Sequence, residues 1–232
     1  MGPHPIAAEG LSAASFLGGL DDAERRSLLE IGLRRSFPRG AVLIYQDEPD
    51  DRVMIVLAGR VKVARLDHDG HELILSIRDP GDLLGELAFI DGHPRVATVT
   101  ALEPVEVVVM LASQLRHHLE HTPRVAVVLL EIIARRFRES TLSRSQVAAS
   151  DTMGRLAARI VELADRYGAP SEEGISVSSP LTQEDLAAWT GASRAGVAEA
   201  LRSLRELGWV RTERGRMVVV DIDALRSRAA PM

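Results

Sequence analysis

The chain contains no cysteine among its 232 residues. Disulfide bridges, cysteine-ligated zinc and iron–sulfur clusters are therefore excluded. Positive charge comes almost entirely from arginine, since Lys62 is the only lysine, and the formal net charge is -5. The chain as a whole does not attract nucleic acid, so any contact with DNA must come from a local basic face.

Long apolar runs are also lacking. The longest runs, such as residues 125–130, fall far short of the roughly 18 residues that span a bilayer. Residues 1–10 contain no basic segment followed by an apolar run, so we expect no secretion signal. These absences predict a soluble cytoplasmic protein that does not bind membranes. Hydrophobic residues make up 46% of the chain, which is enough for a core.

The N-terminal half predicts a short helix followed by strands. Leu20 precedes an acidic helix start at residues 21–24, and apolar residues follow at helical spacing. From Ser36 to Ala112 the apolar period approaches two, and Gly- and Pro-containing turns recur, as at residues 68–71. This pattern favours a small antiparallel barrel or roll with half-buried strands. The expected inward residues are Val42, Ile44, Val53, Ile55, Leu57, Val61, Val63, Leu73, Leu75 and Ile77.

A loop and a short helix, residues 81–99, interrupt this β-rich region. Gly85 and Glu86 open the helix, whose unpaired N–H groups favour an anion. Arg95 follows a Gly- and Pro-containing turn, and its planar fork suits a phosphate. Glu86 can accept hydrogen bonds from a sugar hydroxyl, so the segment predicts a pocket for a phosphorylated ribose. The alternative is a β-turn with a surface Glu86–Arg95 ion pair.

Residues 113–150 predict one long helix that Ser113 can cap. Apolar residues along it alternate at steps of four and three, which is the pattern of helix pairing between two subunits. The seam consists of Ala126, Leu130, Ile133, Phe137, Ser140, Arg144 and Val147. The alternative is a single helix face buried within one chain.

The C-terminal third predicts a winged helix. Residues 152–166 form a helix and residues 167–180 a surface loop. Thr182 starts a capping box, a glycine-containing turn follows, and Ser193 caps a second helix. A hairpin at residues 209–220 completes the module. Arg194 is the expected base reader, because a bidentate arginine suits guanine; the expected phosphate contacts are Arg202, Arg205, Arg214 and Arg216.

The run Gly85-Glu86-Leu87-Ala88, six residues and then Pro94-Arg95 resembles the phosphate-binding cassette of cyclic-nucleotide-binding domains. Together with the C-terminal module, it resembles the cyclic-AMP receptor protein/FNR family of transcription regulators. The resemblance implies an α+β fold. It comprises an antiparallel, jelly-roll-like β-roll sensor domain (1–112), a long dimerisation helix (113–150) and a winged helix-turn-helix domain (151–232).

The same resemblance implies a homodimer that is not an enzyme and needs no cofactor. It implies a cyclic nucleotide as effector (cAMP, with cGMP as another candidate), a palindromic double-stranded DNA site, and RNA polymerase as a partner. The implied effector-binding residues are Gly85, Glu86, Leu87, Ala88, Arg95, Val96, Ser140 and Thr141. The implied DNA-binding residues are Thr182, Gln183, Ser193, Arg194, Ala195, Gly196, Glu199, Arg202, Arg214 and Arg216.

Two departures from the family pattern leave alternatives open. Val96 stands where cyclic-AMP binders usually carry Ser or Thr, so one hydroxyl donor to the phosphate is missing. A regulator of the same build that ignores cyclic nucleotides is therefore a second hypothesis. Ala195 and Glu199 replace a Glu and an Arg on the recognition helix, so the DNA site should differ from that of the cyclic-AMP receptor protein.

An enzyme is a third hypothesis. His117 and His121 lie four residues apart, with Glu120 between them and His118 beside them, which is a spacing that can hold a metal. The sequence offers no second ligand cluster, and a solvated helix start explains these residues better than a metal site does. We therefore expect no catalytic metal.

Overall fold

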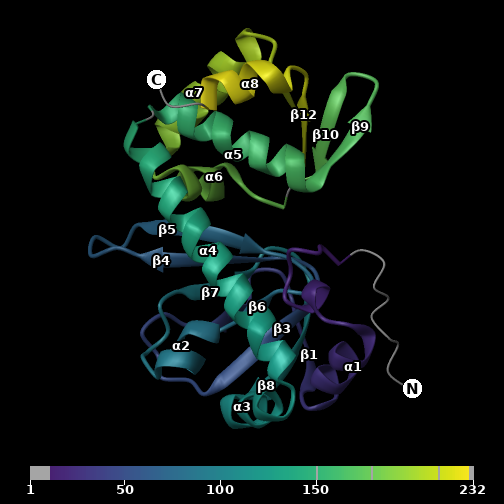
Figure 1. Ribbon diagram of the computed structural model, residues 1–232. Coiled ribbons are helices and arrows are strands. Elements are labelled where there is room, and N and C mark those ends of the chain that lie inside the picture. Colours follow the sequence, from purple (N-terminus) through teal and green to yellow (C-terminus); the bar gives the residue numbers. More distant parts are fainter. Residues whose placement is uncertain (1–10, 150, 179, 214, 230–232) are drawn as a thin grey trace. The chain divides into compact units, whose positions relative to one another are not determined.

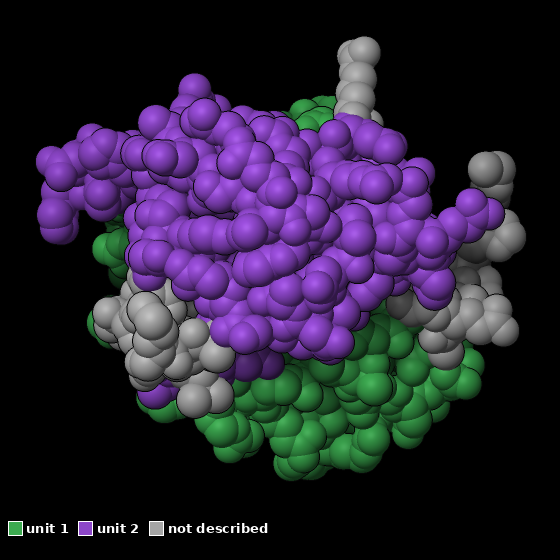
Figure 2. Space-filling view, turned by 90° about the horizontal axis from the view of Figure 1, so that it is seen from above, with its two compact units in different colours: residues 1–66, 75–138 green, residues 67–74, 139–232 purple. Residues whose placement is uncertain are grey.

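The computed structural model describes residues 11–149, 151–178, 180–213 and 215–229, and for residues 142–149 it describes the backbone alone. The chain divides into two compact units (Figure 2). The first unit comprises residues 1–66 and 75–138, and the second comprises residues 67–74 and 139–232.

The first unit begins with a 3-10 turn, η1 (Leu17–Gly19), and helix α1 (Asp22–Glu30). The side chain of Asp21 accepts hydrogen bonds from the N–H groups of Ala23 and Glu24, and Glu24 accepts one from the N–H of Asp21. This capping box satisfies N–H groups that a helix start leaves unpaired. The helix predicted from the acidic residues 21–24 is confirmed.

Two four-stranded sheets form the β-roll (Figure 1). The strands of the first sheet, in spatial order, are β1 (Leu33–Phe37), β8 (Val105–Leu111), β3 (Arg52–Ala58) and β6 (Leu83–Leu84). Those of the second are β2 (Val42–Ile44), β7 (Thr98–Ala101), β4 (Val61–Leu66) and β5 (Glu72–Arg78). Neighbours such as β3 and β8 pair antiparallel, which confirms the predicted roll.

Strand β3 is covered on both faces. Val53, Ile55 and Leu57 point to a core with the helices, whereas Met54 and Val56 point to a core between the sheets. A strand alternates its side chains between two faces, so a strand inside two cores needs a continuous apolar run. The prediction of half-buried strands was therefore wrong for β3.

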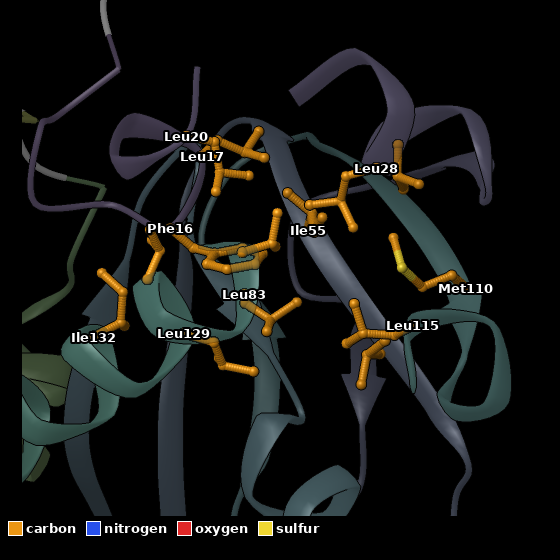
Figure 3. Close-up of a cluster of buried hydrophobic side chains, with 14 of the residues drawn as sticks. Phe16, Leu17, Leu20, Leu28, Ile55, Leu83, Met110, Leu115, Leu129 and Ile132 are labelled. Atoms are coloured by element: carbon orange, nitrogen blue, oxygen red, sulfur yellow. The ribbon is translucent and has the colours of Figure 1, made fainter. Parts of the chain in front are cut away.

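The helix-side core gathers side chains from segments far apart in the chain (Figure 3). Phe16 and Leu28 come from the N-terminal segment, Leu83 and Met110 from the sheet, and Leu115 from the helix after it. Burial of such apolar area is the main favourable term in folding. This core holds the start of the long helix against the β-roll.

Strand β5 contradicts part of the expected inward set. Leu73 and Leu75 are exposed at 45% each, whereas Ile74 and Ile77 are buried. The strand lies at the edge of its sheet, and its pleat turns Ile74 rather than its two neighbours inward. In an edge strand, the spacing of apolar residues along the sequence does not show which face of the sheet is covered by other parts of the protein.

The predicted single helix from Ser113 is two helices, α3 (Ala112–His121) and α4 (Pro123–Ala149). Leu111, not Ser113, occupies the N-cap position of α3. Thr122 separates the two helices with φ -132° and ψ 70°. The residue before a proline is pushed out of the helical region, and Pro123 itself suits the first position of a helix because it has no N–H to satisfy.

Helix α4 has one face in the core and one face exposed. Val125, Val128, Leu129 and Ile132 pack in the helix-side core. On the predicted seam, Leu130 and Phe137 are 64% and 73% exposed. Ala126 and Ile133 of that seam are half-buried, Ser140 is exposed, and the side chains of Arg144 and Val147 lie outside the described residues.

The second unit is a winged helix with an extended sheet. Its helices are α5 (Thr152–Tyr167), α6 (Gln183–Thr190), α7 (Arg194–Glu206) and α8 (Ile222–Ala229). Its strands are β9 (Gly168–Ser171), β10 (Gly174–Ser178), β11 (Val210–Glu213) and β12 (Arg216–Val219), and the sheet order is β11-β12-β10-β9. Leu156, Ile160 and Leu163 of α5 are buried, as predicted.

Residues 167–180 are not the predicted surface loop, because β9 and β10 form a hairpin within them. Strand β10 also pairs with β12, with Ile175 opposite Val219 and Val177 opposite Met217. Glycine, proline and serine give the segment little strand propensity of its own. Hydrogen bonds to β12, some forty residues later in the chain, provide the stabilisation that local strand propensity does not. None of the helices in the described residues is long and apolar enough to cross a bilayer.

Candidate functional site

The cassette contains a turn at position 85 whose backbone conformation suits only glycine. Gly85 is the N-cap of α2 (Glu86–Asp91) and has φ +81°, in the left-handed region that disfavours residues with a Cβ. A Cβ built on Gly85 would lie 2.3 Å from Nη1 of Arg95. No side chain caps α2 among the described residues, so its first N–H groups remain available to an anion.

Arg95 is the buried cation at this turn. The residue is only 3% exposed, and its Nη1 donates to the carbonyl of Gly85 at 2.9 Å. Nη2 donates to the carbonyl of Arg52 and lies 3.5 Å from a carboxylate oxygen of Asp50. Nε is buried, and no acceptor contacts it within the described part of the chain. The guanidinium is therefore fixed in place, and Nε is the one of its three nitrogens that has no hydrogen-bond partner among the described residues.

Asp50 supplies the nearest negative charge to Arg95. Burial alone would raise the pKa of Asp50, but hydrogen bonds and charge from Arg52, with a further contribution from Arg95, outweigh it and lower that pKa below 3.8. The carboxylate accepts two bonds from the Arg52 guanidinium, at 2.9 and 3.0 Å. Because Asp50 is shared between Arg52 and Arg95, these three charged groups together keep a net positive charge.

Glu86 pairs with a residue of α4 rather than with Arg95. Its carboxylate lies 2.6 Å from Nη1 of Arg136, and Asp82 lies 2.9 Å from Nη2. Burial lowers the pKa of Arg136, but the charges and hydrogen bonds of Glu86 and Asp82 outweigh it, so that the pKa of Arg136 is raised. The alternative of a surface Glu86–Arg95 ion pair is therefore wrong. The cassette is instead tied to α4 by a cluster of three partly buried charged residues.

Sequence reasoning missed Arg136, although the sequence carries a signal for it. The core-facing stripe of α4 is Val125, Val128, Leu129 and Ile132, and the next position at that spacing is Arg136. A charged residue that continues an apolar stripe must find a partner, because an unpaired buried charge is costly. Such a break in a stripe can be searched for from sequence alone.

The remaining effector candidates are less enclosed. Leu87 and Val96 are 44% and 42% exposed, and Ala88 is half-buried. Ser140 and Thr141 are exposed on α4. The role of these residues in binding an effector stays a prediction.

The helix-turn-helix has the local chemistry that the sequence predicted. Thr182 and Asp185 cap α6 reciprocally, with the Asp185 N–H donating to Thr182 Oγ1 at 3.1 Å and the Thr182 N–H to Asp185 at 2.9 Å. Gly191 makes the turn with φ +61°. Ser193 Oγ accepts from the N–H of Gly196 at 3.1 Å and caps α7.

Helix α7 buries one face and exposes the other. Val197, Leu201 and Leu204 are buried as predicted. The exposed candidates on or near this helix are Gln183, Ser193, Arg194, Ala195, Glu199, Arg202 and Arg216, whereas Gly196 is half-buried and Arg214 lies outside the described residues. Arg205, expected at a phosphate, donates to Thr212 Oγ1 at 3.1 Å. Contact of these side chains with DNA stays a prediction.

Glu184 is a second residue that sequence reasoning missed. Its carboxylate pairs with Nη2 of Arg194, and both side chains are largely exposed. This hydrogen bond raises the pKa of Arg194. The pair joins the first turn of α6 to the expected base reader at the start of α7. An exposed acidic residue next to the N-cap of the first helix was the available signal.

Two family models match the chain. Residues 34–122 match the cyclic nucleotide-binding domain, and residues 154–228 match the Crp-like helix-turn-helix domain. The "CRP-like cAMP-activated global transcriptional regulator" of Mycobacterium tuberculosis is 33% identical over 219 residues, which cover 94% of this chain and 98% of that protein.

The chain belongs to the CRP/FNR family of transcription regulators.

Other members of the CRP/FNR family agree in sequence or in fold. The "Cyclic AMP receptor protein" of Thermus thermophilus is 28% identical, with 90% of this chain and 94% of that protein covered. The structure of the c-di-GMP-responsive global regulator CLP of Xanthomonas campestris has a TM-score of 0.78 at 20% identity, covering 86% of this chain and 99% of that one. At that identity the likeness shows the fold alone.

The CRP/FNR assignment places the candidate residues within recognised modules. The cassette from Gly85 to Val96 lies in the cyclic nucleotide-binding segment, and the candidates from Thr182 to Arg216 lie in the helix-turn-helix segment. Ser140 and Thr141 fall between the two matched segments. The chain is thus a transcription regulator with a sensor domain and a DNA-binding domain.

Proposed function

We propose that this regulator is a homodimer whose binding to a palindromic DNA site is gated by a cyclic nucleotide, with cAMP as the effector and cGMP as the nearest substitute. It works in the cytoplasm and contacts RNA polymerase as its partner. The observation that carries the proposal is the buried guanidinium of Arg95 beside the uncapped start of α2. Two relatives bear names that refer to cAMP, which supports this choice of effector.

The cassette suits a phosphate for electrostatic reasons. Arg95 is fixed by two carbonyls, and its buried Nε has no hydrogen-bond partner among the described residues, so an anion at this turn would supply the acceptor that Nε lacks. The N–H groups at the start of α2 add further donors. A cyclic phosphodiester carries one negative charge, which this donor set can match.

The sugar and base contacts would link the sensor to α4. A ribose hydroxyl that donates to Glu86 must share that carboxylate with Arg136. Ser140 Oγ and Thr141 Oγ1 can each donate to a ring nitrogen or accept from an exocyclic amine. Occupancy of the cassette then changes the interactions of the helix that we assign to dimerisation, which is how a ligand shifts an equilibrium between two states.

Calorimetry with the full-length chain tests the effector. We expect cAMP to bind the wild type and to lose measurable binding in Arg95→Gln. Arg65→Gln, at an exposed arginine of β4, serves as the matched control and should bind normally. Because Arg95 is buried, circular dichroism must show that the variant is folded. Equal affinity of the folded Arg95→Gln variant and the wild type would refute the phosphate site.

Val96→Ser provides a gain-of-function arm. It restores the hydroxyl donor that cAMP-binding relatives usually have, and one added hydrogen bond to a phosphate should tighten binding by about 1–2 kcal/mol, roughly tenfold. A phosphate that lies elsewhere would leave the affinity of Val96→Ser unchanged. This arm distinguishes a correctly placed phosphate from one bound non-specifically.

The exposed face of α4 supports the homodimer. Leu130 and Phe137 of the predicted seam are 64% and 73% exposed, on the side of α4 away from the core. Exposed apolar residues in a continuous stripe mark interaction surfaces. Leu130→Glu should give a monomer in light scattering, whereas Leu33→Glu, at an equally exposed leucine of β1, should remain a dimer. A monomeric wild type would reject the proposed seam.

DNA binding depends on the exposed face of α7. In a dimer, two recognition helices about 34 Å apart reach successive major grooves of a palindromic site. Glu184 competes with DNA for Arg194, so Glu184→Gln should increase affinity for specific DNA, and Glu206→Gln, at the far end of α7, should not. Fluorescence anisotropy with specific and random duplexes measures both effects. If Glu184→Gln and Glu206→Gln bound specific DNA with the same affinity, Glu184 would not be competing with DNA for Arg194.

A regulator that ignores cyclic nucleotides is the alternative function. Val96 favours it because the cassette lacks the usual hydroxyl. The Xanthomonas regulator of the same fold is described as responding to c-di-GMP, so the fold is compatible with another effector. Specific DNA binding that is equal with and without cAMP and cGMP, together with no heat of binding, would select this alternative.

A further inference from the structure

Three side chains with metal-binding chemistry converge at the end of α3. His117, Glu120 and His121 are exposed, and one ligand atom from each lies within 4.8 Å of the others. Positions three and four apart share one face of a helix, which is why these side chains meet. The rings of His117 and His121 are 4.2 Å apart between centroids. None of these residues takes part in the cassette or in the helix-turn-helix.

A backbone contact prepares His121 for a metal. Its Nδ1 lies 2.8 Å from the carbonyl oxygen of His117. When Nδ1 carries the ring proton and donates to that carbonyl, Nε2 is left with a free lone pair. Metal-binding histidines almost always have such a partner on their other nitrogen, because it fixes the tautomer and the orientation of the ring.

The local field favours a cation. His117, Glu120 and His121 lie in the last turns of α3, where the helix dipole presents its negative end. The two neighbouring arginines have partners elsewhere, since Arg116 donates to the carbonyl of Phe89 at 3.2 Å and Arg124 pairs with Glu24. Glu120 brings a negative charge of its own. A divalent ion at this position meets attraction from both the helix end and a carboxylate.

We propose that His117, Glu120 and His121 bind a divalent transition metal, Zn²⁺ in the first place, with water completing the coordination. Two imidazoles and one carboxylate form a ligand set that zinc accepts, whereas Mg²⁺ and Ca²⁺ require oxygen ligands. The proposal does not depend on the proposed effector. It assigns a metal to the surface of the sensor unit without assigning a catalytic reaction to it.

A second cluster offers an internal control. Asp67, Asp69 and His71 also bring ligand atoms within 4.8 Å of one another. There, one oxygen of Asp67 already accepts the N–H groups of Asp69 and His71, both at 2.9 Å, so the carboxylate stabilises its own turn. His71→Ala therefore removes a histidine from a comparable surface cluster and should leave zinc binding unchanged.

The test is calorimetry with ZnCl2 on untagged full-length protein that has been stripped of metal by a chelator. We expect one Zn²⁺ per chain for the wild type and for His71→Ala, and none for the double variant His117→Ala/His121→Ala. Glu120→Gln should keep one site and bind at least about tenfold more weakly, since loss of even an outer-shell partner costs that much. Zinc should also raise the melting temperature of the wild type but not that of the double variant.

Two results would overturn the site. One is a wild type that takes up no zinc beyond the level of the double variant. The other is a double variant, shown to be folded by circular dichroism, that still binds one equivalent. Loss of binding in His71→Ala with retention in the double variant would place the metal at the other cluster and refute this assignment. All of these readouts are independent of cyclic nucleotides and DNA.

Discussion

Replacement of Arg136 by methionine should strongly destabilise the sensor unit. Arg136 is 14% exposed and holds two carboxylates that are equally buried, Glu86 at 2.6 Å and Asp82 at 2.9 Å. Its Nη1 also donates to the carbonyl of Leu83 at 3.2 Å. Methionine preserves much of the length of the side chain, so packing changes little and the charge is what the variant loses.

The magnitude follows from what remains after the change. Removal of one partner from a buried ion pair costs about 3–5 kcal/mol, because the remaining charge is left without compensation. Asp82 keeps one hydrogen bond, from the N–H of Asp79 at 3.0 Å, which reduces the cost for that carboxylate. We therefore expect Arg136→Met to lower the free energy of unfolding of this unit by about 3 kcal/mol, at the lower end of that range.

Arg138→Met is the matched control. Arg138 lies two residues further along α4 and is exposed. Surface substitutions without such contacts usually stay within about 0.5 kcal/mol. The difference in the free energy of unfolding between Arg136→Met and Arg138→Met then measures the contribution of the cluster with Glu86 and Asp82. The effect of losing an exposed arginine is subtracted in this comparison.

Urea unfolding measured by two probes resolves the effect. Far-UV circular dichroism reports on both units, whereas both tryptophans, Trp189 and Trp209, lie in the second unit. Arg136→Met should shift the dichroism transition to lower urea and leave the fluorescence transition in place. If Arg136→Met were as stable as Arg138→Met at neutral pH, the cluster would carry no net stability and the reasoning would fail.

Three further predictions concern Gly85 of the cassette, Asp50 beside it and the buried Leu204 of the second unit. Gly85→Ala should weaken cAMP binding on the order of tenfold, because its Cβ would meet Arg95 at 2.3 Å and its φ of +81° costs about 1–2 kcal/mol; unchanged calorimetry would contradict this. Asp50 has a lowered pKa, chiefly through Arg52, so its stabilising contribution is present above pH 3.8 and is lost below it. Asp50→Asn should therefore be less stable at pH 6 and equal to wild type near pH 2 in acid unfolding. Leu204→Ala, at a fully buried site, should cost about 2–5 kcal/mol and lower the tryptophan-monitored transition alone.

Local chemistry was readable from the sequence. Asp21, Thr182 and Ser193 each cap the helix that the sequence predicted, because a capping side chain bonds N–H groups within three residues of itself. Gly85 and Gly191 have the positive φ that their turns require. The family pattern, which combines such short-range features in a fixed order, was readable for the same reason.

Some errors came from reading one local signal and neglecting another. The sequence contains Pro123, and its effect on Thr122 divides the expected long helix. The apolar seam was weighted above the proline. A heptad pattern shows which residues can share a face, but it does not show where the backbone can continue as one helix.

Long-range contacts decided the rest. The hairpin of β9 and β10 depends on pairing with β12, and the partner of Glu86 proved to be Arg136 of α4, fifty residues later. Burial of Arg95 to 3% exposure depends on Arg52 and Asp50 of another strand and turn. The sequence by itself determined the caps, the turns, the two modules and their order, because these depend on neighbours in the chain. Only the tertiary structure decided which charges meet and which strands pair, because those free energies exist only after distant segments have been brought together.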